Sequence, residues 1–258
     1  MKKVWGAPRS REDVECQIPE SYLRKDAETQ NRRQLTFLLQ ESAFSEHIPI
    51  FCTIDVDLLA PEQQQLFDGY EFQVHSAIIL GQTIAEPFLW AEQAAPGNRG
   101  NRISSCAELI TLGYLMGFRE KLEMQGYQTH ILPPDPLPNK RLSDMMACSR
   151  KGVTGRNGRF LAGAYGAQVS VGLLLTDAPL MGGDYRYPDV TADVCGDCEE
   201  CMAACPCGAL TTEGYDAALC RAYRDKEENL ERAASHTALK CMRCYTACSK
   251  KYIQSRLK

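Results

Sequence analysis

Long apolar runs are missing from this sequence. No window reaches the roughly 18 consecutive apolar residues that indicate a membrane-spanning helix. The first residues, MKKVWGAPRSRED, carry two lysines but no apolar segment behind them, so they do not match a secretory signal. We therefore expect a cytoplasmic protein that does not bind membranes.

Basic residues are not in excess either. The chain has 29 Lys and Arg against 33 Asp and Glu, a formal net charge of −4. This balance gives no general attraction to a phosphate backbone, so the sequence disfavours tRNA as a partner.

Histidine is scarce, whereas cysteine is abundant. The four histidines share no spacing typical of metal ligands, but there are thirteen cysteines, many of them two or three residues apart. An odd number of clustered cysteines indicates metal ligation in a reducing compartment rather than a disulfide framework.

The cysteines divide the chain into two parts. Before residue 190, helical periodicity at 27–42 and 107–124 alternates with strand-like segments at 72–80, 127–132 and 167–176. The long helix is expected to start at a capping box formed by Ser105 and Glu108. We predict one domain over residues 1–190 and a small ligand-stapled domain over residues 191–258.

The densest cysteine segment reads CGDCEECMAACP, from Cys195 to Pro206. Its C-x2-C-x2-C-x3-C-P spacing is that of bacterial ferredoxins, in which three thiolates bind one cubane and the fourth binds a second cluster. A zinc site uses paired knuckles with four ligands each, so this spacing favours iron–sulfur clusters.

A second set of cysteines lies downstream, at positions 220, 241, 244 and 248. Since the fourth cysteine of the run crosses to the other cluster, eight cysteines make two sets of four. One predicted [4Fe–4S] cluster is held by Cys195, Cys198, Cys201 and Cys248, and the other by Cys205, Cys220, Cys241 and Cys244. Cys207 lies beside the run and receives no ligand role.

Two further motifs precede the cysteines. A glycine-rich turn runs through Gly152, Gly155, Arg156 and Asn157, and Tyr165-Gly166 then leads to a strand ending in TDAPL at residues 176–180. With the lone Cys220 and Tyr223 three residues later, the segment resembles the epoxyqueuosine reductase and reductive dehalogenase superfamily. This chain resembles a short member of it, since only ten residues follow Cys248 and no helical-repeat tail is seen.

The resemblance implies an α+β fold, with a nitroreductase-like α/β sandwich domain followed by a small ferredoxin-like domain that carries both clusters. It also implies a cobalamin or other corrinoid, bound base-off between the domains and reduced by the nearer cluster. Contacts to that cofactor would come from Asn157, Phe160, Tyr165, Arg221 and Tyr223.

The resemblance also suggests a proton donor. Members of the superfamily that modify tRNA have an aspartate ahead of the glycine-rich turn, and Asp135 in ILPPDPLP lies near that place. An aspartate between prolines is equally typical of an ordinary turn.

Three functions fit these features. The first is an iron–sulfur reductase that delivers electrons through a corrinoid to a small organic molecule or a modified nucleoside. The second is an electron-transfer protein that reduces a partner without substrate chemistry of its own. The third is an iron–sulfur flavoprotein. Each needs an external electron donor such as ferredoxin or flavodoxin.

Overall fold

The computed structural model describes residues 27–84, 100–135, 139–163, 165–183, 189–190, 194–226, 241 and 243–256. Its centre is a four-stranded antiparallel sheet with the strand order β1-β2-β6-β3. The strands are β1 (Ile50–Asp55), β2 (Ser76–Thr83), β3 (Thr129–Leu132) and β6 (Val169–Thr176). The architecture therefore mixes helix and sheet, as expected.

The two central strands are the segments with nearly continuous apolar residues. All eight residues of β6 are buried, and six of the eight in β2. Their register pairs Ser76 with Thr176 and Thr83 with Val169 along the full length of both strands. Apolar side chains on both faces require cover on both sides of the sheet.

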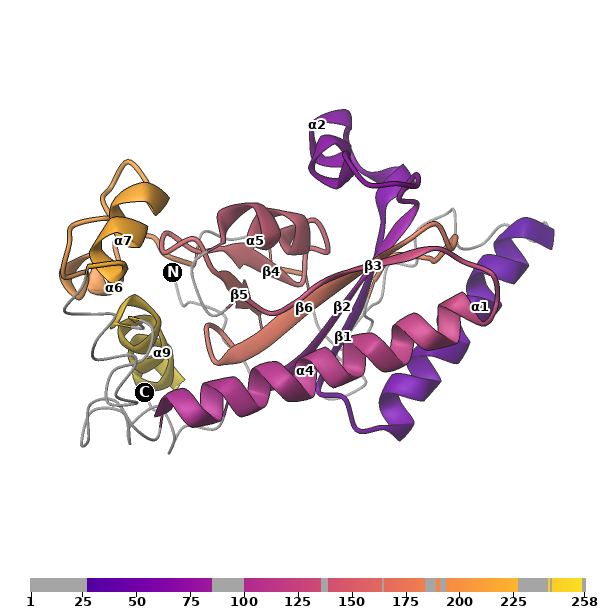
Figure 1. The fold of residues 1–258 in the computed structure, drawn as a ribbon, viewed down its shortest axis with the longest axis horizontal. Helices are drawn as coiled ribbons and strands as arrows, with labels where there is room; N and C mark the ends of the chain where they lie inside the picture. The colour runs from indigo at the N-terminus through magenta and orange to yellow at the C-terminus, as the bar shows by residue number, and fades with distance from the viewer. Residues whose placement is uncertain are drawn as a thin grey trace.

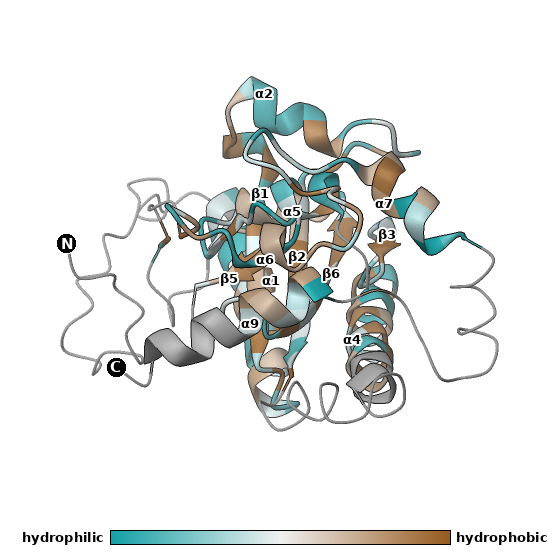
Figure 2. Cartoon of the chain, turned by 90° about the vertical axis from the view of Figure 1, so that its left-hand side faces the viewer, coloured by the Kyte–Doolittle hydropathy of each residue, from teal (hydrophilic) through white to brown (hydrophobic). Residues whose placement is uncertain are grey.

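Helices α1 (Ala27–Ser45) and α4 (Gly100–Glu123) cover one face of the sheet. Leu39 of α1 and Leu115 and Phe118 of α4 pack there against Ile78 and Leu174 of the central strands. Figure 1 shows α4 running along the sheet, and Figure 2 shows apolar residues concentrated in the strands. This layer is one half of the core.

The other face carries short elements. They are η2 (Val56–Leu58), α2 (Pro61–Gln64), η3 (Gln65–Phe67), α5 (Lys140–Ala147) and the hairpin of β4 (Gly152–Thr154) and β5 (Phe160–Ala162). Met145 and Met146 of α5 pack with Phe160 against Val171 and Leu173 of β6. The predicted glycine-rich turn is the tip of this hairpin, so it is held over the sheet.

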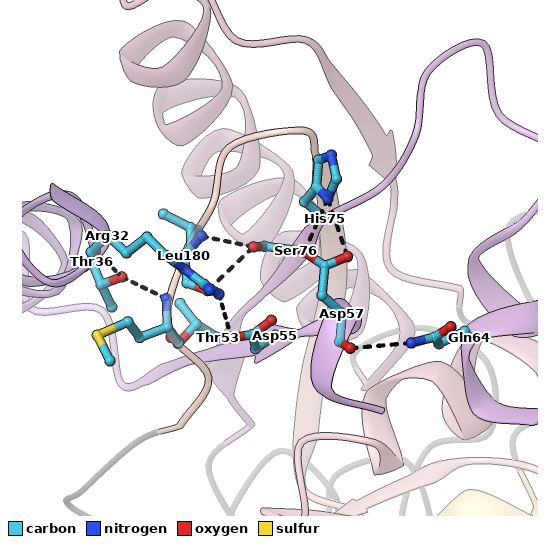
Figure 3. Close-up of polar contacts among 10 residues, drawn as sticks. Arg32, Thr36, Thr53, Asp55, Asp57, Gln64, His75, Ser76 and Leu180 are labelled. Atoms are coloured by element: carbon cyan, nitrogen blue, oxygen red, sulfur yellow. Dashed lines mark hydrogen bonds and ion pairs between the residues drawn. The ribbon is translucent and has the colours of Figure 1, made fainter. Parts of the chain in front are cut away.

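A polar network fixes the end of β1 (Figure 3). Arg32 of α1 forms an ion pair with the buried Asp55 and donates to the carbonyl of Leu180 at 3.1 Å. The backbone N–H of Leu180 donates to Ser76 Oγ at 2.8 Å. Burial raises the pKa of Asp55, although the Arg32 charge opposes this shift. The network ties α1 and the segment after β6 to the sheet edge.

The cysteine-rich part gathers at one end of the sheet (Figure 1). It contains α6 (Glu200–Ala203), α7 (Ala217–Arg224) and α9 (Arg243–Arg256), and α6 packs against α9. Tyr245 of α9 is buried against Ile84, Ala107 and Leu161 of the sheet part. That apolar contact brings the cysteines to the sheet.

One boundary differs from the expectation. The long helix α4 begins at Gly100 rather than at the capping box of Ser105 and Glu108, and it ends at Glu123. Gly126 follows with φ of +89°, the left-handed conformation typical of the residue after a helix. Among the described helices, none is long and apolar enough to cross a membrane.

Candidate iron–sulfur centres and the adjacent pocket

The first predicted cysteine set forms one electrostatic neighbourhood. Burial raises the pKa of the Cys248 thiol to about 12, and the charges of Cys201, Cys195 and Cys198 add to the shift. Burial likewise raises the pKa of Cys201 to about 11, with contributions from Cys195, Cys244 and Cys198. Cys248, more than forty residues from the run, therefore lies with the three thiols that the crossing rule assigns to it.

The second set forms another neighbourhood. Burial raises the pKa of Cys244, Arg159 opposes the shift, and Cys241, Cys220 and Cys205 add to it. These three thiols are the partners that the sequence predicts for Cys244. The charge of Cys244 also raises the pKa of Cys201 in the first set, so the two sets lie next to each other.

Backbone amides prepare Cys205 for ionisation. Burial opposes its charged form, but hydrogen bonds from the backbone N–H groups of Cys207, Ala209 and Leu210 lower its pKa overall. Such amides stabilise a thiolate, which is the form that binds iron.

The donor set fits two cubanes chemically. Buried thiols with raised pKa values are costly to ionise alone, and bound iron removes that cost because it coordinates the thiolate form. Within the part of the chain that the structure describes, no three His, Cys, Asp or Glu side chains converge as ligands of a single metal ion. The sets are neighbourhoods of thiols rather than formed coordination spheres.

Arg156 joins the glycine-rich turn to the cysteine run. Its guanidinium donates to the carbonyls of Cys198 at 2.8 Å and Gly196 at 3.0 Å. Its backbone N–H donates to Cys195 Sγ at 3.3 Å. One residue of the hairpin therefore holds the loop that carries three cysteines of the first predicted set.

A pocket opens between the sheet, α5 and α9. Its lining combines apolar and polar side chains. The described lining is Ile84, Glu108, Pro134, Asp135, Asn139, Leu142, Ser143, Met146, Arg159, Phe160, Ala167, Val169, Ser170, Val171 and Tyr245. An apolar pocket with a few convergent polar groups is typical of an organic ligand site.

Asp135 is held in this pocket by the cap of α5. Asn139 precedes the helix, and its Oδ1 accepts from the backbone N–H of Leu142 at 3.1 Å. Its Nδ2 then donates to Asp135 Oδ2 at 3.2 Å. The bond to the helix fixes the side-chain amide of Asn139, and this amide in turn orients the carboxylate of Asp135. Asp135 is half-buried.

Arg159 and Tyr245 connect the pocket to the second cysteine set. The Arg159 guanidinium lies over the Tyr245 ring, 4.9 Å from its centroid. Both residues line the pocket, Tyr245 follows Cys244 in the chain, and Arg159 acts on the charge of Cys244. The second set is therefore next to the pocket wall.

The residues predicted to contact a cofactor lie in different places. Phe160 lines the pocket. Asn157 is buried in the hairpin tip, where its Oδ1 accepts from the Arg159 N–H, and Tyr165 packs beside the core. Arg221 is exposed on α7, and Tyr223 lies under the Lys226 ammonium. These last four lie outside the described lining, and their cofactor role stays a prediction.

Sequence reasoning missed the pocket residues Asn139, Arg159 and Tyr245, and the clamp at Arg156. Arg159 and Tyr245 come from segments 86 positions apart and share no motif. Asn139 carried a usable signal, because it is an N-cap residue close to the candidate aspartate.

Comparison with known proteins identifies relatives. No model of a known protein family matches the chain. Epoxyqueuosine reductase of Listeria monocytogenes is 32% identical over 240 residues, which cover 81% of this chain and 60% of the relative. The superfamily resemblance seen in the sequence is confirmed, and the chain spans about three fifths of that relative's length.

Solved structures agree with the fold. An epoxyqueuosine reductase crystallised with an epoxyqueuosine-modified tRNA-Tyr stem loop superposes with a TM-score of 0.52 at 16% identity, covering 84% of this chain and 66% of that one. The enzyme of Bacillus subtilis, with its catalytic aspartate loop swung out of the active site, gives 0.52 at 15% identity, covering 83% and 64%.

The stem loop corrects one expectation. The net charge of the chain disfavoured tRNA as a partner, yet this structural relative is bound to a tRNA stem loop. The prediction against tRNA is therefore wrong, because a net charge says nothing about how charge is distributed over a surface.

Proposed function

We propose that this relative of the epoxyqueuosine reductases is an iron–sulfur reductase that carries electrons through two [4Fe–4S] clusters to a base-off corrinoid beside the pocket. The observation that carries the proposal is the adjacency of the second cysteine set to the pocket that contains Asp135. The proposal includes the domain pair that cysteine density and the resemblance imply: a nitroreductase-like domain over residues 1–190 and a ferredoxin-like domain over residues 191–258.

The order of the clusters follows from Tyr245 and Arg159. We assign the proximal cluster to Cys205, Cys220, Cys241 and Cys244, because Arg159 of the pocket wall acts on the charge of Cys244. Cys195 and Cys248 of the other set also pack against the apolar cluster that contains Tyr245. The set of Cys195, Cys198, Cys201 and Cys248 is the distal cluster, which receives electrons from an external ferredoxin or flavodoxin. The charge of Cys244 raises the pKa of Cys201, so the two thiols lie close together, which supports a short path for electrons from one cluster to the other.

The pocket supplies the remaining chemistry. A bound corrinoid supplies the metal centre that reduces the substrate. Reductive removal of an epoxide oxygen needs two electrons and two protons, so an acid must stand at the reacting oxygen. Asp135 is placed for this task, since the cap residue Asn139 orients its carboxylate in the pocket.

A catalytic aspartate loop in a relative supports the role of Asp135. In the Bacillus subtilis epoxyqueuosine reductase, a catalytic aspartate loop can swing out of the active site. Asp135 also lies on a loop, between β3 and α5, ahead of the glycine-rich turn.

A modified nucleoside in tRNA is the substrate that we propose. Residues 140–159 carry six basic residues, at positions 140, 141, 150, 151, 156 and 159, against one acidic residue, Asp144. The segment has a net charge of +5 in a chain of −4, and it forms α5 and the hairpin beside the pocket. Asp189, from outside the segment, pairs with Arg150 and Lys151 and lowers the local charge by one. A local basic surface of this kind attracts phosphates.

The test begins with anaerobic reconstitution using iron, sulfide and hydroxocobalamin. We expect about eight irons per chain from two four-iron clusters, a base-off cobalt(II) signal after desalting, and reduction of an epoxyqueuosine-containing stem loop. Iron without retained corrinoid would refute the corrinoid reductase and indicate an electron-transfer protein. Retained flavin in its place would indicate a flavoprotein.

Asp135→Asn tests the acid. We expect the rate of substrate reduction to fall by about 10²–10⁴-fold, the range for loss of a positioned acid, with unchanged iron content and stem-loop affinity. Asp177→Asn is the matched control, since Asp177 is also a loop aspartate after a strand but accepts from the backbone N–H of Gln128. Equal rates in the two variants would remove Asp135 from the mechanism.

A further inference from the structure

A ninth cysteine lies among the proposed cluster ligands. Cys207 follows Cys205 by two residues, and their Sγ atoms are 3.8 Å apart. The backbone N–H of Ala209 donates a hydrogen bond toward both sulfur atoms, so both thiols point to the same side of the turn. Cys207 also lies near Cys220, a second ligand of the proximal set.

The other described cysteines outside the two sets have no such position. Cys52 is buried in β1 and contacts the carbonyl of Thr53, and Cys148 contacts the carbonyl of Asp144 after α5. Cys106 lies in α4. Among the described cysteines that lack an assigned role, Cys207 alone shares a ligand's sulfur environment.

We propose that Cys207 is a reserve ligand of the proximal cluster, able to bind its iron in place of Cys205. The inference rests on the proposed function, because it presupposes that the second set holds a cluster. Only Pro206 separates the two cysteines, and Gly208 follows Cys207 at φ of +68°. This tight turn holds the two sulfur atoms 3.8 Å apart, so a rotation about the Cα–Cβ bonds brings either one to the same iron.

The exchange is balanced without an oxidant or a reductant. The iron–sulfur bond to Cys205 breaks and an iron–sulfur bond to Cys207 forms. The entering thiol of Cys207 releases its proton, and the departing thiolate of Cys205 takes it up. Iron keeps its oxidation state, and the cluster keeps four thiolate ligands.

Iron content after reconstitution tests the proposal without reference to activity. We expect about eight irons per chain in the wild type, in Cys207→Ala and in Cys205→Ala, the last with an altered EPR signal. We expect about four irons in the double variant Cys205→Ala/Cys207→Ala. Cys241→Ala is the control, because no spare thiol is described near Cys241. This variant should also hold about four irons per chain.

The outcomes separate the two proposals. About four irons in Cys205→Ala, as in Cys241→Ala, would overturn the reserve ligand while leaving the two clusters intact in the wild type. Fewer than eight irons in the wild type would instead contradict the proposed function.

Alkylation of the reconstituted wild type gives an answer that does not depend on how a variant folds. Iodoacetamide followed by peptide mass spectrometry should label Cys207 and spare Cys205. In Cys205→Ala, Cys207 should become protected. Protection of Cys207 together with labelling of Cys205 in the wild type would contradict the proposal, since Cys207 would then be the resident ligand.

Discussion

Replacing Arg156 by alanine would remove the clamp between the hairpin and the distal cluster loop. The side chain makes two hydrogen bonds to the carbonyls of Cys198 and Gly196, at 2.8 and 3.0 Å. A hydrogen bond with one charged partner contributes about 1.5–3 kcal/mol. Because Arg156 is part-exposed, we take the lower end and expect a loss of about 3 kcal/mol for the two bonds together.

This loss should appear as loosening of the loop rather than as unfolding of the sheet. The backbone N–H of residue 156 still donates to Cys195 Sγ in the variant, so the change isolates the guanidinium. A cost of 3 kcal/mol raises the population of the open loop by about 100-fold, since 1.4 kcal/mol is a factor of ten.

The assay is iron release to a chelator under anaerobic conditions. We expect about four of the eight irons to leave Arg156→Ala much faster than the wild type, while the remaining irons leave at the wild-type rate. Arg156→Lys keeps the charge but lacks the planar fork that holds two carbonyls, so its rate should be intermediate.

Arg119→Ala is the matched control for this variant. Arg119 also makes a short polar contact, to Glu123 at 2.8 Å, but the pair is exposed on α4, where solvent screens it and it contributes little to stability. Identical release kinetics in Arg156→Ala and Arg119→Ala would show that the guanidinium does not hold the cluster loop.

Two further variants test the fold that positions the site. Leu174→Ala removes a fully buried side chain from β6 and should lower the free energy of unfolding by about 2–5 kcal/mol in a urea titration, whereas Leu58→Ala, at a side chain that is 63% exposed, should cost far less. Gly152→Ala places a Cβ 2.4 Å from Phe160 Cζ and should destabilise the hairpin by about 1–3 kcal/mol, whereas Gly113→Ala meets open space in α4 and should stabilise the protein by about 0.5–1 kcal/mol. A thermal unfolding series that ranked Gly152→Ala with Gly113→Ala would contradict the packing of the hairpin.

Features encoded over short stretches of sequence could be predicted. The strands β2 and β6 follow from apolar runs, and α1 follows from helical periodicity. The division of the cysteines into two cluster sets rests on ligand spacing and stays a prediction. The structure groups Cys248 with the three cysteines of the run even though it is distant in sequence.

Features that depend on tertiary contacts could not be predicted. The helix α4 begins at Gly100, five residues before the local capping signal at Ser105, so that signal does not mark the start of the helix. Arg159 and Tyr245 meet only because α9 docks on the sheet through a small apolar cluster. No residue spacing in the sequence predicts that α9 packs against the sheet.

The error about tRNA has a physical cause that the charges make plain. A net charge averages the whole surface, whereas a phosphate backbone senses charges within about a Debye length, close to 8–10 Å at physiological salt. Segment 140–159 carries +5 and borders the pocket, and even with Asp189 paired to Arg150 and Lys151 it stays basic in a chain whose total is −4. If that segment guides the stem loop, replacing Lys140 and Arg150, whose side chains are each 68% exposed, by glutamine should weaken binding. It should also flatten the dependence of binding on salt by about one unit of slope per lost contact. An unchanged slope in a fluorescence-anisotropy titration would mean that the tRNA approaches over another surface.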